Sequence, residues 1–356
     1  MVRKELLKFV LKEFKILMKA LIESNKNLKK YNTFSVSASA EKFSIFKSEK
    51  ELLELLNNTK DIPLLILGGG SNLLFTQNVT GIILKNEILG LQLLEETLDS
   101  VLIKCGAGEI WHEFVINCVN KGYAGLENLS LIPGTVGASP IQNIGAYGVE
   151  VKDTIESVEC IEIKTGLKKR LTNAECAFGY RDSIFKKTDK GRYVITYVAF
   201  RLKKQALVNT SYGAIQKILD EKGITNPNIR DVSRAVVDIR RSKLPNPAQL
   251  GNAGSFFKNP EISEKQFASL KLQYPDIVSF QGSSQGLIKV SAGWLIERSG
   301  WKGKTVGNVG VHRLQALVIV NYGGASGQEV IDLSTAVRQS VQELFDIDLI
   351  PEVNII

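Results

Sequence analysis

Ser255 stands in residues 251–260 (GNAGSFFKNP) among small residues, with no basic partner beside it. A serine that attacks an acyl or phosphoryl group needs a neighbouring base, and the histidines of this chain, His112 and His312, lie far away in sequence. A serine that gives its proton to a substrate as a general acid needs no such base. Because a hydroxyl is a weak acid, its target would be a carbanion or enolate, as in reduction of a carbon–carbon double bond. A tight turn with an incidental serine is the alternative.

Two glycine-rich segments are suited to binding phosphate groups. In residues 68–72 three glycines precede a serine and an asparagine, so backbone N–H groups can approach an anion without interference from Cβ atoms. This segment is neither a dinucleotide GxGxxG motif nor a Walker loop, and a bare structural turn is the alternative. Residues 132–148 (IPGTVGASPIQNIGAYG) carry further glycines among neutral polar side chains. Together the two segments indicate one extended nucleotide cofactor that carries its own negative charge.

The surrounding pattern predicts the elements that position these segments. Residues 62–67 read as a strand that leads into the first glycine segment, and residues 111–121 read as a helix that precedes the second. The strand-like pattern of apolar residues ends at residues 203–210, where we place the main domain boundary. The last third alternates helical runs with strand-like ones, which is typical of a small α+β domain.

Composition and charge exclude several classes of protein. The net charge is +8, but residues 1–30 hold nine Lys or Arg and three Glu, so the rest of the chain carries only +2, and no nucleic-acid partner is expected. Residues 1–25 place apolar residues at helical spacing opposite lysines, which predicts a basic amphipathic helix that docks on the chain itself, a partner or a membrane surface. Signal-peptide and membrane-spanning patterns are lacking.

The cysteines show no metal-binding or disulfide pattern. Cys105, Cys118, Cys160 and Cys176 form no CxxC pair, and only two histidines accompany them. We therefore expect no metal site and free buried thiols in a cytoplasmic protein.

Six motifs together resemble one known family. They are LGGGSNLLF, IPGTVGASPIQNIGAYG, FGYRDSIFK, GNAGSFFKNP, AGWLIERSGWKG and the terminal PEV, and they run in family order from about Tyr31 to Ile356. This pattern is similar to that of the MurB family of UDP-N-acetylenolpyruvoylglucosamine reductases of peptidoglycan synthesis. The segment SYGAIQKIL resembles one found in the long, Escherichia-type branch of that family.

The resemblance implies an α+β fold of the vanillyl-alcohol-oxidase-like FAD-binding type, with a C-terminal α+β substrate-binding domain. On this basis we expect an FAD-binding domain over residues 26–205, divided into subdomains 26–80 and 81–205. Residues 206–356 would form the substrate domain, and the C-terminal segment would return to the active site.

The resemblance also implies roles for individual residues. Ser255 matches the proton donor of the family, and Arg181 and Glu352 match its two polar partners in catalysis. Tyr180, Tyr212, Lys243 and Asn259 match residues that contact substrate, Tyr212 being the gating tyrosine. Non-covalent FAD would be held by Gly68, Gly69, Gly70, Ser71, Asn72, Pro133, Gly134, Gly137, Ala138, Ser139, Gln142, Asn143, Gly145 and Ala146. Arg298 departs from the family pattern, which has a neutral amide there.

The implied reaction reduces UDP-N-acetylglucosamine-enolpyruvate to UDP-N-acetylmuramate. NADPH would give hydride to FAD, the flavin would pass it to the enolpyruvyl double bond, and Ser255 would protonate the resulting carbanion while Arg181 stabilises its charge. Two alternatives remain: a flavin oxidase of the same fold, which would usually attach its flavin through His or Cys, and a catalytically silent nucleotide-binding or membrane-associated scaffold.

Overall fold

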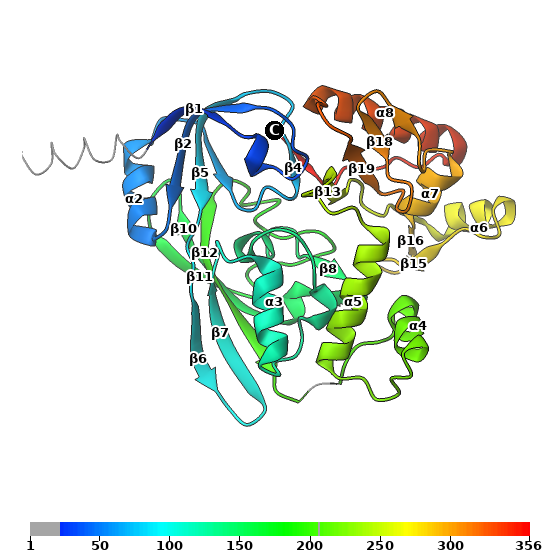
Figure 1. The fold of residues 1–356 in the computed structure, drawn as a ribbon, viewed down its shortest axis with the longest axis horizontal. Coiled ribbons are helices and arrows are strands. Elements are labelled where there is room, and N and C mark those ends of the chain that lie inside the picture. The colour runs from blue at the N-terminus through cyan, green and yellow to red at the C-terminus, as the bar shows by residue number, and fades with distance from the viewer. Residues whose placement is uncertain (1–21, 206) are drawn as a thin grey trace, which may run out of the picture.

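The chain begins with a mixed four-stranded sheet (Figure 1), and the computed structural model describes residues 22–205 and 207–356. Its strand order is β1-β2-β5-β3, with β1 antiparallel to β2 and the other neighbours parallel. Helix α2 (Glu49–Asn58) packs Leu52, Leu55 and Leu56 onto this sheet, and the Ser48 side chain caps it by accepting a hydrogen bond from Glu51 N. The strands are β1 (Glu23–Asn27), β2 (Ser39–Phe46), β3 (Leu64–Leu67) and β5 (Val79–Asn86).

Two predicted boundaries in this region, the end of the N-terminal helix and the subdomain break at about residue 80, differ from the bounds of the elements. The predicted N-terminal helix falls mostly on residues 1–21, which lie outside the described residues, but its last residues are part of strand β1. Strand β1 is polar and exposed, so its sequence lacks the apolar alternation by which strands are recognised. The predicted subdomain break at residues 80/81 falls inside β5, because Gly81 adopts a φ of +94° within the strand instead of ending it. The first subdomain therefore extends through Asn86.

A five-stranded antiparallel sheet forms the second subdomain, with strand order β11-β10-β12-β7-β6. Helix α3 (Trp111–Asn120) packs onto it, and the rings of Trp111, Phe114 and Phe200 contact one another in its core. The strands are β6 (Leu91–Glu96), β7 (Ser100–Gly106), β10 (Ile155–Glu162), β11 (Lys168–Thr172) and β12 (Tyr193–Lys203). Shorter elements of the first 205 residues are β4 (Leu73–Leu74), β8 (Gly145–Ala146), β9 (Val149–Glu150), and the 3-10 helices Lys29–Tyr31, Glu127–Leu129, Val136–Ala138 and Val151–Asp153.

Helices α4 (Gly213–Glu221) and α5 (Ile229–Lys243) lie beyond the predicted domain boundary at residue 206, yet they pack against the second subdomain. The Ser233 hydroxyl of α5 lies 2.8 Å from the Ser130 hydroxyl, and Arg240 Nε donates to the Leu131 carbonyl. In Figure 1, α5 lies beside α3. These helices therefore link the second subdomain to the C-terminal domain, whose sheets begin only at β13 (Gly251–Ser255).

The C-terminal domain contains two small sheets and three helices around its own apolar core. The four-stranded sheet has the order β13-β19-β18-β17, and the three-stranded sheet has the order β14-β16-β15. Their elements are β14 (Glu261–Ser263), α6 (Glu264–Gln273), β15 (Ser279–Gln281), β16 (Leu287–Val290), α7 (Ala292–Arg298), β17 (Thr305–Val306), β18 (Val309–Val311), β19 (Val318–Asn321) and α8 (Gly327–Phe345).

The end of the chain leaves this domain and returns to the first subdomain. Strand β20 (Asn354–Ile355) pairs in parallel with β4, which directly follows the first glycine segment. Figure 1 shows the C-terminus beside β4. Glu352, which precedes β20, is therefore carried to the same place as Asn72. Over the residues that the structure describes, no helix is long and apolar enough to cross a membrane.

Candidate active site

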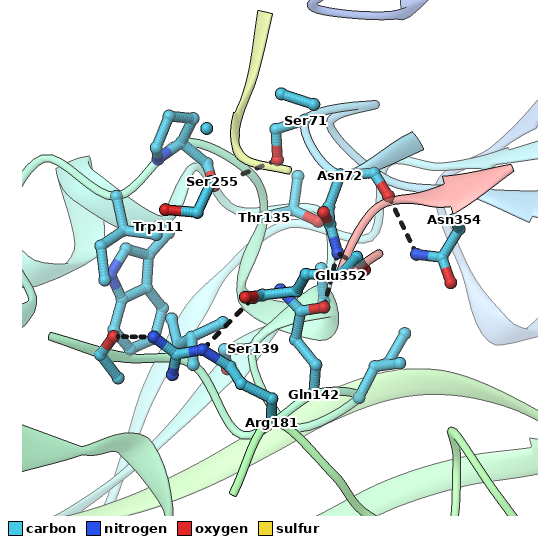
Figure 2. A pocket seen from close by; sticks show the side chains of 18 of the residues that line it. Ser71, Asn72, Trp111, Thr135, Ser139, Gln142, Arg181, Ser255, Glu352 and Asn354 are labelled. Atoms are coloured by element: carbon cyan, nitrogen blue, oxygen red, sulfur yellow. Dashed lines mark hydrogen bonds and ion pairs between the residues drawn. The ribbon is translucent and has the colours of Figure 1, made fainter. Parts of the chain in front are cut away.

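A cavity of about 210 Å³, here called the central cavity, lies where both FAD-domain glycine segments, the YRDS loop, β13 and the C-terminal segment meet. Figure 2 shows Arg181 and Glu352 pointing toward one another, with Ser255 above them in this view. The central cavity is lined by Ser71, Asn72, Trp111, Ile132, Pro133, Thr135, Ala138, Ser139, Ile141, Gln142, Ile144, Gly145, Arg181, Arg240, Ala253, Gly254, Ser255, Glu352 and Asn354.

The two glycine segments lie directly against each other. A Cβ added to Gly68 would lie 2.7 Å from Thr135 Oγ1, and one added to Gly69 would lie 2.9 Å from Gly134 Cα. Gly70 has a φ of +64°, and its added Cβ would lie 2.0 Å from the Tyr31 carbonyl oxygen. These glycines are thus required by close backbone approach within the protein, which brings the two segments to one wall of the site.

Ser255 ends strand β13 and faces the cavity. Strand β13 is held by antiparallel pairing with β19, in which Ser255 is opposite Val318. The preceding residue, Gly254, adopts a φ of +70° and also lines the cavity. Within the described part of the chain, no side chain or backbone group forms a hydrogen bond with the exposed Ser255 hydroxyl, and the Ser71 hydroxyl beside it donates to the Pro133 carbonyl. The hydroxyl is therefore available to a ligand.

Arg181 and Glu352 form an ion pair inside the cavity. Arg181 Nε lies 3.2 Å from Glu352 Oε1, and Arg181 Nη2 donates to the Gly145 carbonyl over 2.6 Å. The Nε group is nevertheless buried without a hydrogen-bond partner among the described residues, because its N–H does not point well at the carboxylate. A buried donor left in this state is costly, so the contacts of Arg181 with Gly145 and Glu352 must hold it in this position.

Gln142 joins this ion pair to the loop after Gly70. Its Nε2 donates to Glu352 Oε1 over 3.3 Å, while its Oε1 accepts from Asn72 Nδ2 and from Lys186 Nζ. The backbone of Glu352 is fixed as well, since its N–H donates to the Phe256 carbonyl over 2.8 Å. The carboxylate is therefore positioned by contacts from the FAD domain and from the C-terminal domain together.

Arg240 of α5 is a site residue that sequence reasoning missed. It lines both the central cavity and an adjoining cavity of about 660 Å³, and Ile132, Pro133 and Gly254 are also shared between the two. Burial lowers the pKa of the Arg240 guanidinium, with the Tyr147 phenol opposing that effect. A partly buried cation that lines two adjoining cavities suits the phosphate part of a long ligand.

Other missed residues are Trp111, Thr135, Lys186 and Asn354. Trp111 begins α3, and its indole Nε1 donates to the Leu129 carbonyl over 2.9 Å. Asn354 Nδ2 donates to the Asn72 carbonyl over 2.9 Å. The only local signals for these residues are the positions of Lys186 in the FGYRDSIFK motif and of Thr135 in the second glycine segment.

Half of the predicted cofactor residues line the central cavity, namely Ser71, Asn72, Pro133, Ala138, Ser139, Gln142 and Gly145. The other half does not line the central cavity and consists of Gly68, Gly69, Gly70, Gly134, Gly137, Asn143 and Ala146. Asn143 is completely buried, and its amide bonds the Gly179 carbonyl and the Lys152 N–H, so it joins two loops of the site. Gly137 packs against Ala107, where a Cβ would lie at 2.5 Å from the alanine Cβ.

Four of the eight non-glycine residues with positive φ in the described chain lie in the loops that form the central cavity. Leu131, Asn143, Tyr147 and Arg181 all have φ values between 45° and 60°, a region that costs energy for residues other than glycine. All four lie in the second glycine segment, directly before it, or in the YRDS loop. The surrounding contacts must therefore hold these loops in shapes that the chain alone would not prefer.

The four predicted substrate residues lie outside both cavities. The Tyr180 ring lies under Lys289 Nζ at 3.7 Å, and burial raises the pKa of its phenol. Tyr212 is exposed and packs edge-on against Tyr147 at 5.1 Å, while Lys243 is the last residue of α5. Asn259 Oδ1 accepts from Ala292 N, the first residue of α7.

Arg298 also lies outside the cavities, at the C-terminal end of α7. Its guanidinium carbon is 5.7 Å from the centre of the Tyr274 ring, a cation–π contact on the surface. Among the described residues no group of three or more His, Cys, Asp or Glu could hold a metal ion.

Comparisons with known proteins agree with this arrangement. The family model "FAD binding domain" matches residues 41–171, and "UDP-N-acetylenolpyruvoylglucosamine reductase, C-terminal domain" matches residues 246–356. The crystal structure of UDP-N-acetylenolpyruvylglucosamine reductase from Thermus caldophilus matches with a TM-score of 0.66 at 24% identity, covering 94% of this chain and 97% of that one. The α+β fold with an FAD-binding domain and a distinct C-terminal domain is thus confirmed.

Two sequence relatives extend the match to nearly full length. The UDP-N-acetylenolpyruvoylglucosamine reductase of Flavobacterium johnsoniae is 47% identical over 336 residues, covering 94% of this chain and 99% of that protein. The one of Amoebophilus asiaticus is 49% identical over 337 residues, with 94% and 99% covered. The family that the sequence motifs predicted is confirmed: the chain is an FAD-dependent oxidoreductase that belongs to the UDP-N-acetylenolpyruvoylglucosamine reductase family.

Proposed function

We propose that this protein reduces UDP-N-acetylglucosamine-enolpyruvate to UDP-N-acetylmuramate for peptidoglycan synthesis, using NADPH as the hydride source. The observation that carries the proposal is that Ser255, Arg181 and Glu352, from three distant segments, line one cavity beside the glycine segments. A proton donor, a cation and a carboxylate around one small cavity are what addition of hydride and a proton to an enol ether requires.

The residues present fit FAD. The central and adjoining cavities share a wall and together suit a long ligand with an aromatic end and a charged middle. Ser71, Asn72, Ser139 and Gln142 offer neutral polar groups, and Arg240 offers a partly buried cation for the diphosphate. Bound FAD supplies the hydride chemistry, taking a hydride from NADPH and giving it to the substrate.

Arg181 stabilises the charge that develops on the substrate. When hydride adds to the methylene carbon of the enolpyruvyl group, negative charge appears on the adjacent carbon and its carboxylate. The guanidinium of Arg181 lines the cavity and is fixed by the Gly145 carbonyl and by Glu352, so it needs little reorganisation to meet this charge. Glu352 keeps the guanidinium in place through the 3.2 Å contact.

Ser255 donates the proton that completes the reaction. Its hydroxyl has no protein partner in the described chain and faces the cavity, so a carbanion formed there can take its proton. Glu352 lies in the same cavity and assists the same intermediate.

Tyr180, Tyr212, Lys243 and Asn259 contact the substrate: Lys243 and Asn259 bind its nucleotide part, and Tyr212 is the gating tyrosine. With FAD along the glycine segments, the central cavity of about 210 Å³ cannot also hold a whole UDP-sugar, so the nucleotide must extend past the cavity. The exposed Tyr212 and the terminal Lys243 of α5 are free to contact it. We place the reaction in the cytoplasm, which agrees with four free buried cysteines.

An anaerobic visible spectrum of the purified protein tests the proposal. We expect NADPH to bleach a flavin band and UDP-N-acetylglucosamine-enolpyruvate to restore it. A flavin that is reduced but recovers only with oxygen would support an oxidase of the same fold. A colourless protein that does not take up FAD would contradict the enzyme and leave a nucleotide-binding scaffold.

A further inference from the structure

Lys186 is a half-buried cation beside the central cavity, and the reaction proposed above gives it no role. It follows the YRDS loop, and its Nζ lies 3.3 Å from Gln142 Oε1 and 3.5 Å from the Glu352 carbonyl oxygen. Burial lowers the pKa of this ammonium, with nearby Lys258 adding to the effect. Its neighbour Lys187 is 72% exposed and pairs with Asp182.

No direct ion pair offsets the partial burial of Lys186. Within the described residues its Nζ has no carboxylate within ion-pair distance, and its two contacts are to an amide oxygen and a backbone oxygen. A half-buried ammonium held only by neutral oxygens gives up part of its hydration without gaining a carboxylate partner. Its two contacts therefore indicate a role in orienting the groups that it touches.

The contacts of Lys186 determine which way the Gln142 amide faces. A lysine ammonium has three donors and no acceptor, so it can face only the oxygen of that amide. Asn72 also requires the Gln142 oxygen to face it. Its Nδ2 donates to the Glu352 carbonyl, which can only accept a hydrogen bond, so the same NH2 group is the one that faces Gln142. With its oxygen held by two donors, Gln142 must present its NH2 group to Glu352 Oε1.

The opposite orientation would be harmful. If the amide turned over, its oxygen would face the carboxylate of Glu352, and an attraction would become a repulsion. The carboxylate would then lose one of its two fixed neighbours, the other being Arg181. Lys186 thus acts on the ion pair of the cavity without touching either of its charged groups.

We propose that Lys186 is a positioning residue for the reaction: by holding the Gln142 amide oxygen and the Glu352 carbonyl, it fixes the Glu352 carboxylate against Arg181. This inference rests on the proposed function, and it assigns Lys186 to the step in which the substrate is reduced. It leaves the reduction of FAD by NADPH to other groups.

The test compares Lys186→Met with Lys187→Met, a matched loss of the adjacent exposed lysine. FAD content, flavin reduction by NADPH and flavin reoxidation by UDP-N-acetylglucosamine-enolpyruvate are measured separately by stopped flow. We expect Lys186→Met to keep its FAD and its reduction rate and to reoxidise about 10- to 100-fold more slowly, since small misplacements of a reacting group cost this much. Lys187→Met should match the unaltered protein.

A double-mutant cycle with Gln142→Ala shows whether Lys186 acts through Gln142. If it does, adding Lys186→Met to Gln142→Ala slows reoxidation by less than about twofold. The absorption band of the oxidised flavin gives a second readout that needs no turnover, and Lys186→Met should shift it only when Gln142 is present. The proposal would be overturned if Lys186→Met slowed reoxidation or shifted the flavin band by the same amount with and without Gln142→Ala. It would also be overturned if Lys186→Met slowed flavin reduction and flavin reoxidation equally.

Lys186→Gln covers the case in which the methionine variant does not fold. It keeps a hydrogen-bond donor without the charge, so we expect slowing intermediate between the unaltered protein and Gln142→Ala. Reoxidation at the unaltered rate in this folded variant, together with an unshifted band, would also overturn the proposal. Failure of the unaltered protein to reoxidise with substrate would instead contradict the proposed function, while the flavin band would still report on the Lys186–Gln142 coupling.

Discussion

Arg181 Nε lies 3.2 Å from Glu352 Oε1, and the two residues come from the FAD domain and from the C-terminal segment respectively. Because β20 pairs with β4 just beyond Glu352, the carboxylate reaches Arg181 only when the end of the chain is docked on the first subdomain. Assembly of the two domains and formation of the cavity are thus the same event.

Arg181→Lys is expected to slow reoxidation of the flavin by substrate about 10²- to 10³-fold. This is the usual effect of removing a fixed hydrogen-bond donor that stabilises the charge developing in the transition state. A lysine cannot reach the Gly145 carbonyl and the cavity at the same time, because it lacks the planar guanidinium. Stopped-flow reoxidation measures the effect. Arg338→Lys, which alters a surface pair with Asp348, is the control and should keep the full rate.

Ser255→Ala is expected to leave flavin reduction by NADPH nearly unchanged and to slow the second half-reaction about 10²- to 10⁴-fold, as loss of a general acid does. The hydroxyl has no protein partner in the described residues, so its removal should not lower the thermal midpoint. Ser283→Ala, on a surface loop, is the matched control. Equal slowing of both half-reactions would show that Ser255 is not the proton donor.

The sequence predicts the chemistry of the site better than its packing. Ser255, Arg181 and Glu352 stand in motifs with recognisable neighbours, and all three line the central cavity. Arg240 and Lys186 were missed, because their roles come from contacts with Leu131 and Gln142 that are distant in sequence. No local spacing rule reports such contacts.

The glycines show a second limit of sequence reasoning. Their spacing indicated a phosphate-binding loop, but the structure shows that Gly68 and Gly69 are needed because Gly134 and Thr135 lie against them. Strand β1 shows a third limit, since its polar residues become a strand only by pairing with β2. In both cases a tertiary partner decides what the local pattern leaves open.

Gly69→Ala is therefore expected to weaken FAD binding about tenfold or more. The new Cβ would lie 2.9 Å from Gly134 Cα, and separating two packed backbones costs about 1–3 kcal/mol. The ratio of flavin to protein absorbance during dialysis measures the loss. Gly213→Ala, at the first residue of α4 with no atom within 4 Å, should retain FAD fully. Unchanged FAD retention in Gly69→Ala would contradict the close contact.

The four cysteines give a prediction on pH and stability. Burial raises the pKa values of Cys118, Cys160 and Cys176 from 9.0 to about 12, and it raises that of Cys105 as well. Below pH 9 these thiols are protonated in both the folded and the unfolded protein, so they do not affect stability. Between pH 9 and 12 the unfolded thiols ionise while the folded ones do not, so the free energy of unfolding should fall as pH rises.

Urea unfolding at pH 8 and pH 10 measures this effect, and a variant with Cys160→Val and Cys176→Val should lose less stability over that interval than the unaltered protein. The same burial predicts that an aromatic disulfide reagent at pH 8 labels these four thiols only after unfolding, because the thiolate is the reactive form. Rapid labelling of the folded protein would mean that the core of the second subdomain opens to solvent, and the packing of Trp111, Phe114 and Phe200 around Cys118 would then have to be looser than the structure shows.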